Sequence, residues 1–247
     1  LPMLLNPDDF RALHYVGSMG PAAAAIIMTA AVHGRGGLRL FAARLIRWRG
    51  CGRWLAFAAT LPIGLYAIGV IISSSAGDSV DMGSFLGSKE YGHVGLALVP
   101  IEIVCFGFGE EAGWRGFLIP ELESSGRTPY RATTLFIAIW ATWHLPLFFY
   151  AYGLGSMPLP MVPGWLVSIA LSSYLITWLF HRARDSILVV AVFHGMVDLV
   201  SITPASTAVV LVTVNAGLIA AAILTLTRST QLFRAHVPET LGTYLVS

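Results

Sequence analysis

Residues 92–118 read GHVGLALVPIEIVCFGFGEEAGWRGFL, an apolar run that contains four charged residues: Glu102, Glu110, Glu111 and Arg115. A helix needs about 20 mostly apolar residues to cross roughly 30 Å of hydrocarbon, and this run is long enough. Ionisable side chains inside a bilayer are costly and mark functional sites. The run therefore predicts a membrane protein and identifies the helix on which its chemistry depends.

The composition of the whole chain agrees with this prediction. Of its 247 residues, 56% are hydrophobic and only 11% are charged, whereas soluble domains carry about 25% charged residues. The formal net charge of +2 excludes a protein with a dominant basic surface, so we expect no nucleic-acid partner. Cys51 and Cys105 lie in different contexts and offer no disulfide framework.

Seven stretches are long and apolar enough to span a membrane, which predicts an all-α, polytopic transmembrane helical bundle. They cover residues 15–33, 54–76, 92–118, 133–152, 164–181, 186–202 and 205–227. Six or eight spans are also compatible with the sequence, because only Thr203-Pro204 separates the last two. All connections are short and no internal repeat is present, so we expect residues 1–247 to form a single membrane domain.

Basic residues are distributed unevenly over the predicted connections. One side of the membrane would carry Arg35, Arg39, Arg44, Arg47, Arg49, Arg53, Arg127, Arg131, Arg182, Arg184, Arg228 and Arg234. The other side would carry Arg11 and Lys89. Because cytoplasmic loops collect Lys and Arg, this distribution predicts an N-out, C-in topology in the cytoplasmic membrane.

Residues 38–48 predict an amphipathic helix that lies on the inner leaflet. Its apolar face would comprise Leu38, Phe41, Leu45 and Trp48. Its basic face would comprise Arg39, Arg44 and Arg47.

The third span carries a pair of adjacent glutamates. Glu111 and Arg115 stand four residues apart, so on a helix they can form an ion pair that offsets part of their burial. Glu110 points about 100° away and lacks that counter-ion, which makes it a candidate general base. Gly109 and Gly113 form a small-residue face that lets another helix approach closely. The alternative interpretation is an ion pair that only fixes helix packing.

Two later spans carry further ionisable residues. His144 precedes Pro146, which removes a backbone hydrogen bond and should loosen the helix around the imidazole. His194 and Asp198 stand four residues apart on one face, a spacing that suits an Asp-oriented histidine or two metal ligands. For each histidine, the alternative is a hydrogen-bonded packing residue of the bundle core.

The depth of these residues suggests a common site. Counted from the predicted inner helix ends at 1.5 Å per residue, Glu110, His144, His194 and Asp198 lie about 12–18 Å deep, in the inner half of the bilayer. Glu102 lies in the outer half and is left out of the site. The sequence predicts a hydrolytic or metal site that faces the cytoplasm, in a catalytic-like core over residues 92–202.

Three motifs follow one another on three spans: Glu110-Glu111-x-x-x-Arg115, Trp140-x-x-x-His144 and His194-x-x-x-Asp198. Their order resembles the CAAX prenyl protease and bacteriocin-processing (CPBP, or Abi) family of intramembrane endopeptidases, over about residues 107–198. The resemblance implies a helical bundle with a cavity open to the cytoplasmic leaflet. It also implies that Glu110 and His144 activate water while His194 and Asp198 stabilise the oxyanion. Expected partners are membrane lipids and a membrane-associated peptide or protein, with or without a prenyl group.

Two residues depart from the family pattern. The second motif usually begins with Phe, and we expect Trp140 to alter packing more than chemistry. The third motif often ends in Asn, which can donate a hydrogen bond to an oxyanion, whereas an ionised Asp198 can only accept one. We therefore expect Asp198 to orient His194.

Other mechanisms use the same residues. A divalent metal such as zinc would be held by Glu111, His144, His194 and Asp198, whereas the favoured mechanism requires no cofactor. A non-enzymatic transporter or scaffold would use these groups as a proton or cation site. A thiol protease based on Cys105 is disfavoured, because Cys105 lies about 140° from Glu110 around the helix.

Overall fold

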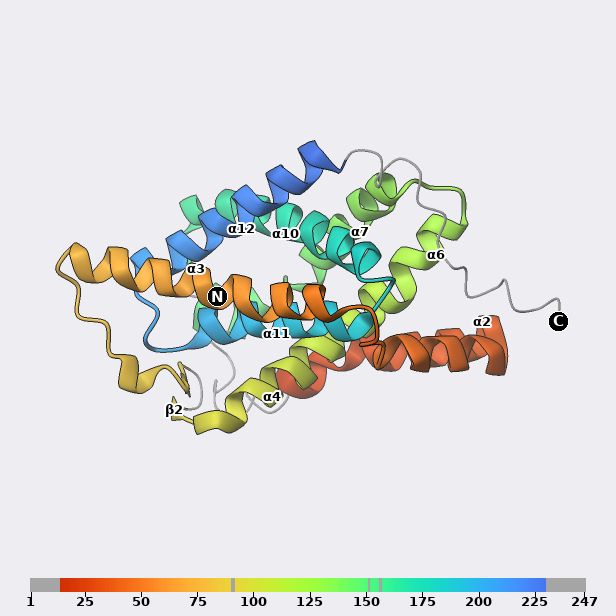
Figure 1. Cartoon of the computed structure of the whole chain (residues 1–247), viewed down its shortest axis with the longest axis horizontal. Helices are drawn as coiled ribbons and strands as arrows, with labels where there is room; N and C mark the ends of the chain where they lie inside the picture. The colour runs from red at the N-terminus through yellow and green to blue at the C-terminus, as the bar shows by residue number, and fades with distance from the viewer. Residues whose placement is uncertain (1–13, 90–91, 151, 156, 230–247) are drawn as a thin grey trace.

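The computed structural model describes residues 14–89, 92–150, 152–155 and 157–229, and within these ranges the chain is mainly helical (Figure 1). The longer helices are α2 (Gly20–Leu45), α3 (Gly52–Ser75), α7 (Pro129–Trp143), α10 (Val162–Arg182), α11 (Ile187–Ile202) and α12 (Ala208–Arg228). The short helices α8 (Leu147–Tyr150) and α9 (Tyr152–Gly155) follow α7. The described residues form a single antiparallel hairpin, of β1 (Gly87–Ser88) and β2 (Gly92–His93). Arg11 and Arg234, which the topology argument used, lie outside the described residues.

The predicted helical membrane bundle is confirmed. Among the described residues, five helices are long and apolar enough to cross a membrane: His14–Leu45, Gly52–Ser75, Pro129–Phe149, Leu159–Arg182 and Ala208–Arg228. The sixth predicted span corresponds to α11, which is apolar but shorter. The Thr203-Pro204 break separates α11 from α12, as expected.

The remaining predicted span, over residues 92–118, is a helix in which α-helical and π-helical segments alternate. It starts at Leu98, six residues later than predicted. It consists of α4 (Leu98–Glu102), η3 (Ile103–Phe108), α5 (Gly109–Gly113), η4 (Trp114–Leu118) and α6 (Ile119–Ser124), in which η3 and η4 are π-helical. Residues 92–97 instead form β2 and a short 3-10 turn. Single π turns within α-helices are frequent at functional sites, and here they flank the two glutamates.

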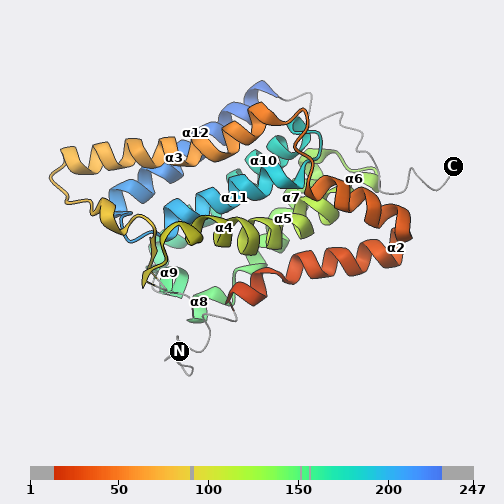
Figure 2. The same ribbon diagram turned by 60° about the horizontal axis from the view of Figure 1, so that its bottom comes forward.

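The first helix folds back on itself at Gly34, where φ is 60° and ψ is −153° (Figure 2). Only glycine adopts such a conformation readily, which explains the expected break after residue 33. The second half of α2 ends at Leu45 rather than at Trp48. The prediction that Arg44 lies on a basic outer face is wrong, because its side chain is fully buried and pairs with Asp185 at 3.7 Å.

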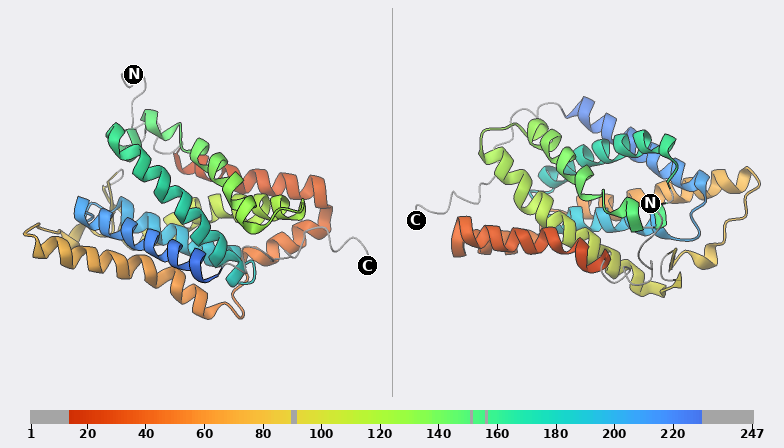
Figure 3. Two further views of the ribbon diagram at one scale, coloured as in Figure 1. Left: turned by 90° about the horizontal axis from the view of Figure 1, so that it is seen from above. Right: turned by 180° about the vertical axis from the view of Figure 1, so that it is seen from behind.

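Helix α11 is the centre of the bundle. It packs against α3, α10 and the helix over Leu98–Ser124, while α12 covers α3 and α10 (Figures 2 and 3). Gly107 and Gly195 permit the crossing: a Cβ on Gly107 would lie 2.2 Å from the backbone oxygen of Ala191, and one on Gly195 2.6 Å from Cα of Ile103. This close approach brings the glutamates of α5 next to the histidine of α11.

The opposite face of α5 packs against the first helix through the two glycines that the sequence singled out. A Cβ on Gly109 would lie 2.6 Å from the backbone oxygen of Ser18, and one on Gly113 2.4 Å from Cβ of Pro21. The predicted small-residue face is therefore confirmed, and its partner is the N-terminal half of α2.

Replacing Gly113 with leucine is expected to destabilise the bundle. The new side chain would collide with backbone atoms that cannot move aside cheaply, so the free energy of unfolding should fall by roughly 1–3 kcal/mol or more. Gly64→Leu is the matched control, because nothing lies within 4 Å of a Cβ at that exposed position in α3. Unfolding in mixed detergent micelles measures both variants, and equal stabilities would contradict the packing role of Gly113.

Polar contacts join several helix ends at the end of the bundle that carries the arginines. His181 at the end of α10 lies 3.0 Å from both Glu123 of α6 and Asp185. Trp178 of α10 donates to Ser229 after α12 at 3.1 Å. We call this the arginine end, because the described basic residues predicted to be cytoplasmic flank these helix ends.

Candidate functional site

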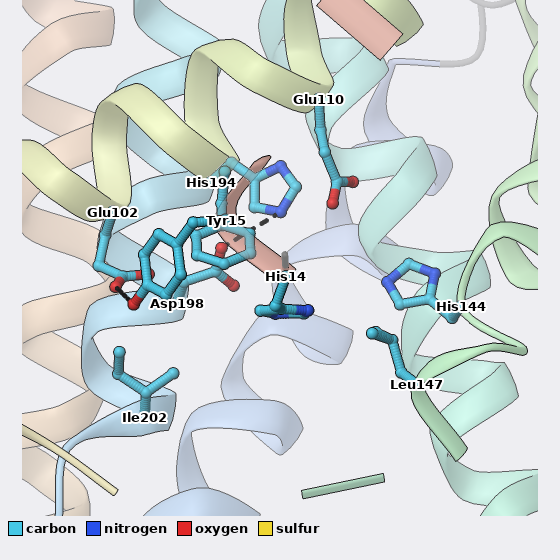
Figure 4. Close-up of a pocket in the computed structure, with 10 residues that line it drawn as sticks. His14, Tyr15, Glu102, Glu110, His144, Leu147, His194, Asp198 and Ile202 are labelled. Carbon is cyan, nitrogen blue, oxygen red and sulfur yellow. Dashed lines mark hydrogen bonds and ion pairs between the residues drawn. The ribbon is translucent and has the colours of Figure 1, made fainter. Parts of the chain in front are cut away.

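A cavity of about 150 Å³ collects residues from four helices (Figure 4). It is lined by His14, Tyr15, Glu102, Phe106, Glu110, His144, Leu147, His194, Asp198 and Ile202. Four of the six predicted site residues therefore line one cavity. The other two, Glu111 and Arg115, are fully buried behind it.

Glu110 is held by two tryptophans and points into the cavity (Figure 4). Its Oε2 accepts hydrogen bonds from Nε1 of Trp140 at 2.8 Å and from Nε1 of Trp114 at 3.2 Å. Both donors bind the same oxygen, and the side chain is only 6% exposed. Trp140 thus does more than fill space at this position, because phenylalanine has no group that could replace this donor.

His144 follows the last residue of α7, where Pro146 has ended the helix as expected. Its Nδ1 lies 2.7 Å from the backbone oxygen of Trp140. Because a carbonyl oxygen only accepts, Nδ1 must carry the hydrogen, which leaves Nε2 of a neutral ring as an acceptor. The ring packs edge-on against Trp140 and Trp165, with centroids 5.2 and 5.7 Å away.

Glu111 forms the link between α5 and α11. Its Oε1 accepts from Nη1 of Arg115 at 2.9 Å and lies 2.7 Å from Nδ1 of His194. On the other side of the imidazole, Nε2 lies 3.5 Å from Oδ2 of Asp198. The predicted pairs Glu111–Arg115 and His194–Asp198 both occur, but the shorter contact of His194 is with Glu111.

Both ring nitrogens of His194 face a carboxylate oxygen, which fits an imidazolium with two N–H donors. Glu111 thus orients His194 from behind, and Asp198 flanks it on the cavity side. Because Nε2 lies 3.5 Å from Asp198, beyond normal hydrogen-bond length, its N–H can be presented to an oxyanion, a role that an ionised Asp198 alone cannot fill. The guanidinium of Arg115 is further enclosed by Phe136, whose ring centre is 4.5 Å away.

Glu102 belongs to the cavity, and its exclusion from the predicted site is a correction. Eight residues in a regular α-helix turn a side chain about 80° away from its starting direction. Residues in a π turn advance by less than 100° each, so the η3 segment brings Glu102 closer to the direction of Glu110 than a regular α-helix would. Both carboxylates therefore line the same cavity, and Glu102 accepts a hydrogen bond from Tyr15 Oη at 3.1 Å.

His14 and Tyr15 were not foreseen as site residues. They lie in the first described helical turn, next to Phe106, with ring centroids 5.1 and 4.9 Å from it. Figure 4 shows His14 between Asp198 and His144, across the cavity from Glu110. No sequence motif marks these two residues.

The cavity lies away from the arginine end. His14 begins the first described helix, Leu147 follows α7 and Ile202 ends α11, and each of these positions is remote from the arginine-bearing connections. Nearby, Lys89 donates to the backbone oxygen of Ser206 at 3.3 Å, and burial lowers its pKa. These lining residues therefore lie toward the helix ends that the N-out prediction assigns to the outer side of the membrane.

A second cavity, of about 190 Å³, shares three residues with the first: His144, His194 and Asp198. Its remaining lining is mainly aromatic and aliphatic and comes from α7, α10, α11 and α12: Trp140, Trp165, Ile169, Ile176, Phe193, Val197 and Leu218, with Ser168, Ser172 and Asn215. The two cavities thus meet at these three residues: the first cavity is polar and contains carboxylates, and we call the second the aromatic chamber.

The predicted metal-ligand set does not fit the geometry. Over the described ranges, no three His, Cys, Asp or Glu side chains are grouped as the ligands of a metal ion would be. Oε1 of Glu111 is already occupied by Arg115 and His194. Cys105 does not line the cavities described above, which agrees with its low rank as a nucleophile.

Comparisons with known proteins agree with the resemblance seen in the motifs. Residues 93–200 match the family described as "Type II CAAX prenyl endopeptidase Rce1-like". The chain is also 27% identical over 136 residues to "CAAX prenyl protease 2" of Methanococcus maripaludis, an alignment that covers 53% of this chain. It spans about half (49%) of the length of that relative.

Proposed function

We propose that this chain is an intramembrane endopeptidase of the CAAX prenyl protease-like (CPBP) kind. The match of residues 93–200 to the type II CAAX prenyl endopeptidase family and the similarity to a CAAX prenyl protease support this proposal. The chain hydrolyses a peptide bond of a membrane-associated substrate with a water molecule activated by Glu110 and His144. The observation that carries this proposal is the fixed carboxylate of Glu110, which shares a cavity with His144 and His194.

The proposed reaction uses the donors and acceptors of the cavity. Glu110 takes a proton from water, and Nε2 of His144 accepts the second hydrogen bond of the same water. The resulting hydroxide attacks the peptide carbonyl carbon, and an N–H of His194 stabilises the oxyanion. The C–N bond then breaks as the proton passes from Glu110 to the leaving amine, so one water is added across the bond.

We assign no metal to this mechanism, because the residues that would hold one do not converge. The substrate lies where the two cavities meet, with its scissile bond beside His144 and His194. The apolar groups of the substrate next to that bond occupy the aromatic chamber. The expected substrates are membrane-associated peptides, with or without a prenyl group. We expect the protein to lie in the cytoplasmic membrane, with lipids around the bundle.

Cleavage by the protein in liposomes tests the proposal. Wild-type protein should cleave at least one of two matched membrane-anchored peptides, prenylated or acylated, and should keep its rate after exhaustive chelation. His144→Ala should lower the rate by about 10²- to 10⁴-fold, the usual contribution of general acid–base catalysis.

The outcomes separate the alternatives. A wild-type rate for His144→Ala would end the proposed mechanism. Activity that is lost on chelation and restored by zinc would overturn its metal-free form. Proton or cation flux without peptide cleavage would replace the endopeptidase with a transporter.

A further inference from the structure

Trp140 contacts every group that the proposed reaction uses. Its Nε1 donates to Glu110 at 2.8 Å, and its backbone oxygen lies 2.7 Å from Nδ1 of His144. Its ring lies edge-on to His194, with centroids 5.9 Å apart, and the guanidinium of Arg115 lies 5.4 Å from its ring centre. The side chain is 5% exposed.

We propose that Trp140 is a positioning residue for the reaction, because its indole N–H fixes the carboxylate of Glu110 relative to His144. This inference rests on the proposed function. Phenylalanine, the residue expected at this place in the motif, could fill the same space but could not donate a hydrogen bond. The tryptophan therefore adds a polar contact to a position that otherwise serves packing.

Trp114 cannot fill this role, although it donates to the same oxygen. It stands four residues after Glu110 on the same helix, so its bond at 3.2 Å holds the carboxylate only against its own helix. Trp140 belongs to α7, the helix that ends next to His144. One residue thus holds the carboxylate through its side chain and the imidazole through its backbone, which sets the spacing of the two groups that bind water.

The hydrogen bond can be separated from packing by an isosteric substitution. Replacing Trp140 with benzothienylalanine exchanges the indole N–H for sulfur and keeps the shape of the ring, including its stacking on Phe136. Loss of a hydrogen bond to a charged group should lower kcat by about 10- to 100-fold. KM should change less than about twofold, because the bond acts on Glu110 and not on the substrate. Trp140→Phe should show the same loss.

The matched control is benzothienylalanine at Trp178, which donates to Ser229 at 3.1 Å and lies at the arginine end. That protein should keep the wild-type kcat. A wild-type kcat with benzothienylalanine at position 140, or an equal loss at position 178, would overturn the inference. Either result would leave the proposed endopeptidase function standing, because that function does not depend on the hydrogen bond of Trp140.

A spectroscopic measurement tests the bond without turnover. In ¹H–¹⁵N spectra, the indole resonance of Trp140 should move on Glu110→Gln, whereas that of Trp178 should not. If the wild-type protein cleaves no peptide, the proposed function fails and this shift still decides whether Trp140 holds Glu110. An unmoved Trp140 resonance would contradict the bond on which the inference depends.

Discussion

Glu110→Gln is expected to reduce peptide cleavage by about 10²- to 10⁴-fold while the bundle stays folded. The amide oxygen of glutamine can still accept hydrogen bonds from Trp114 and Trp140, so the side chain should keep its place. It cannot take a proton from water, however, and the reaction as proposed begins with that step. The initial rate of peptide hydrolysis in liposomes, with the unfolding midpoint of the same sample, measures both parts of the prediction.

Glu121→Gln is the control for this experiment. Glu121 is also a glutamate of the helix over Leu98–Ser124, but it pairs with His33 at 2.7 Å and does not line the cavity. The control variant should cleave at the wild-type rate. Equal rates for Glu110→Gln and wild type would remove Glu110 from the mechanism.

Arg115→Met is expected to lower the free energy of unfolding by about 3–5 kcal/mol, the usual cost of removing one partner of a buried ion pair. Arg115 is fully buried and binds Glu111 at 2.9 Å, and its Nη2 donates to the backbone oxygen of Ser173 at 3.3 Å. Without it, the carboxylate of Glu111 would keep only His194 as a donor. Unfolding in mixed micelles measures the loss.

A second substitution distinguishes loss of the pair from loss of packing. Arg115→Met with Glu111→Gln should recover part of the stability, because replacing both partners leaves no uncompensated charge. Arg131→Met, at an exposed position in α7, should change stability by less than about 0.5 kcal/mol. No recovery in the double variant would mean that the arginine stabilises the bundle mainly by filling space.

The bundle and four of the residues that line the cavity could be predicted because they depend on local spacing. Apolar runs of spanning length identified the helices, and the i, i+4 pairs Glu111–Arg115 and His194–Asp198 occur as expected. The break at Gly34 and the close approach at Gly113 also follow from the residue type. These features need no knowledge of which helices are neighbours.

The errors arose where geometry departed from a straight α-helix or where the partner was distant in sequence. Glu102 was left out because of its depth, yet the cavity extends along the helix far enough to include it, and the π turn of η3 turns its side chain toward the side of Glu110. The contacts of Trp140 with Glu110 and of Glu111 with His194 join residues 30 and 83 positions apart.

The polar contacts of the site have a consequence for insertion into the bilayer. Glu110 has a donor in Trp114, Glu111 a counter-ion in Arg115, and His194 a carboxylate in Asp198, each four residues away on its own helix. Each helix therefore brings partners for these three groups before it meets another helix, which lowers the free-energy cost of inserting that helix into hydrocarbon on its own. The contacts of Trp140 with Glu110 and of Glu111 with His194 form only when the helices associate. The two helices can thus insert independently, and the reactive geometry is completed by their assembly.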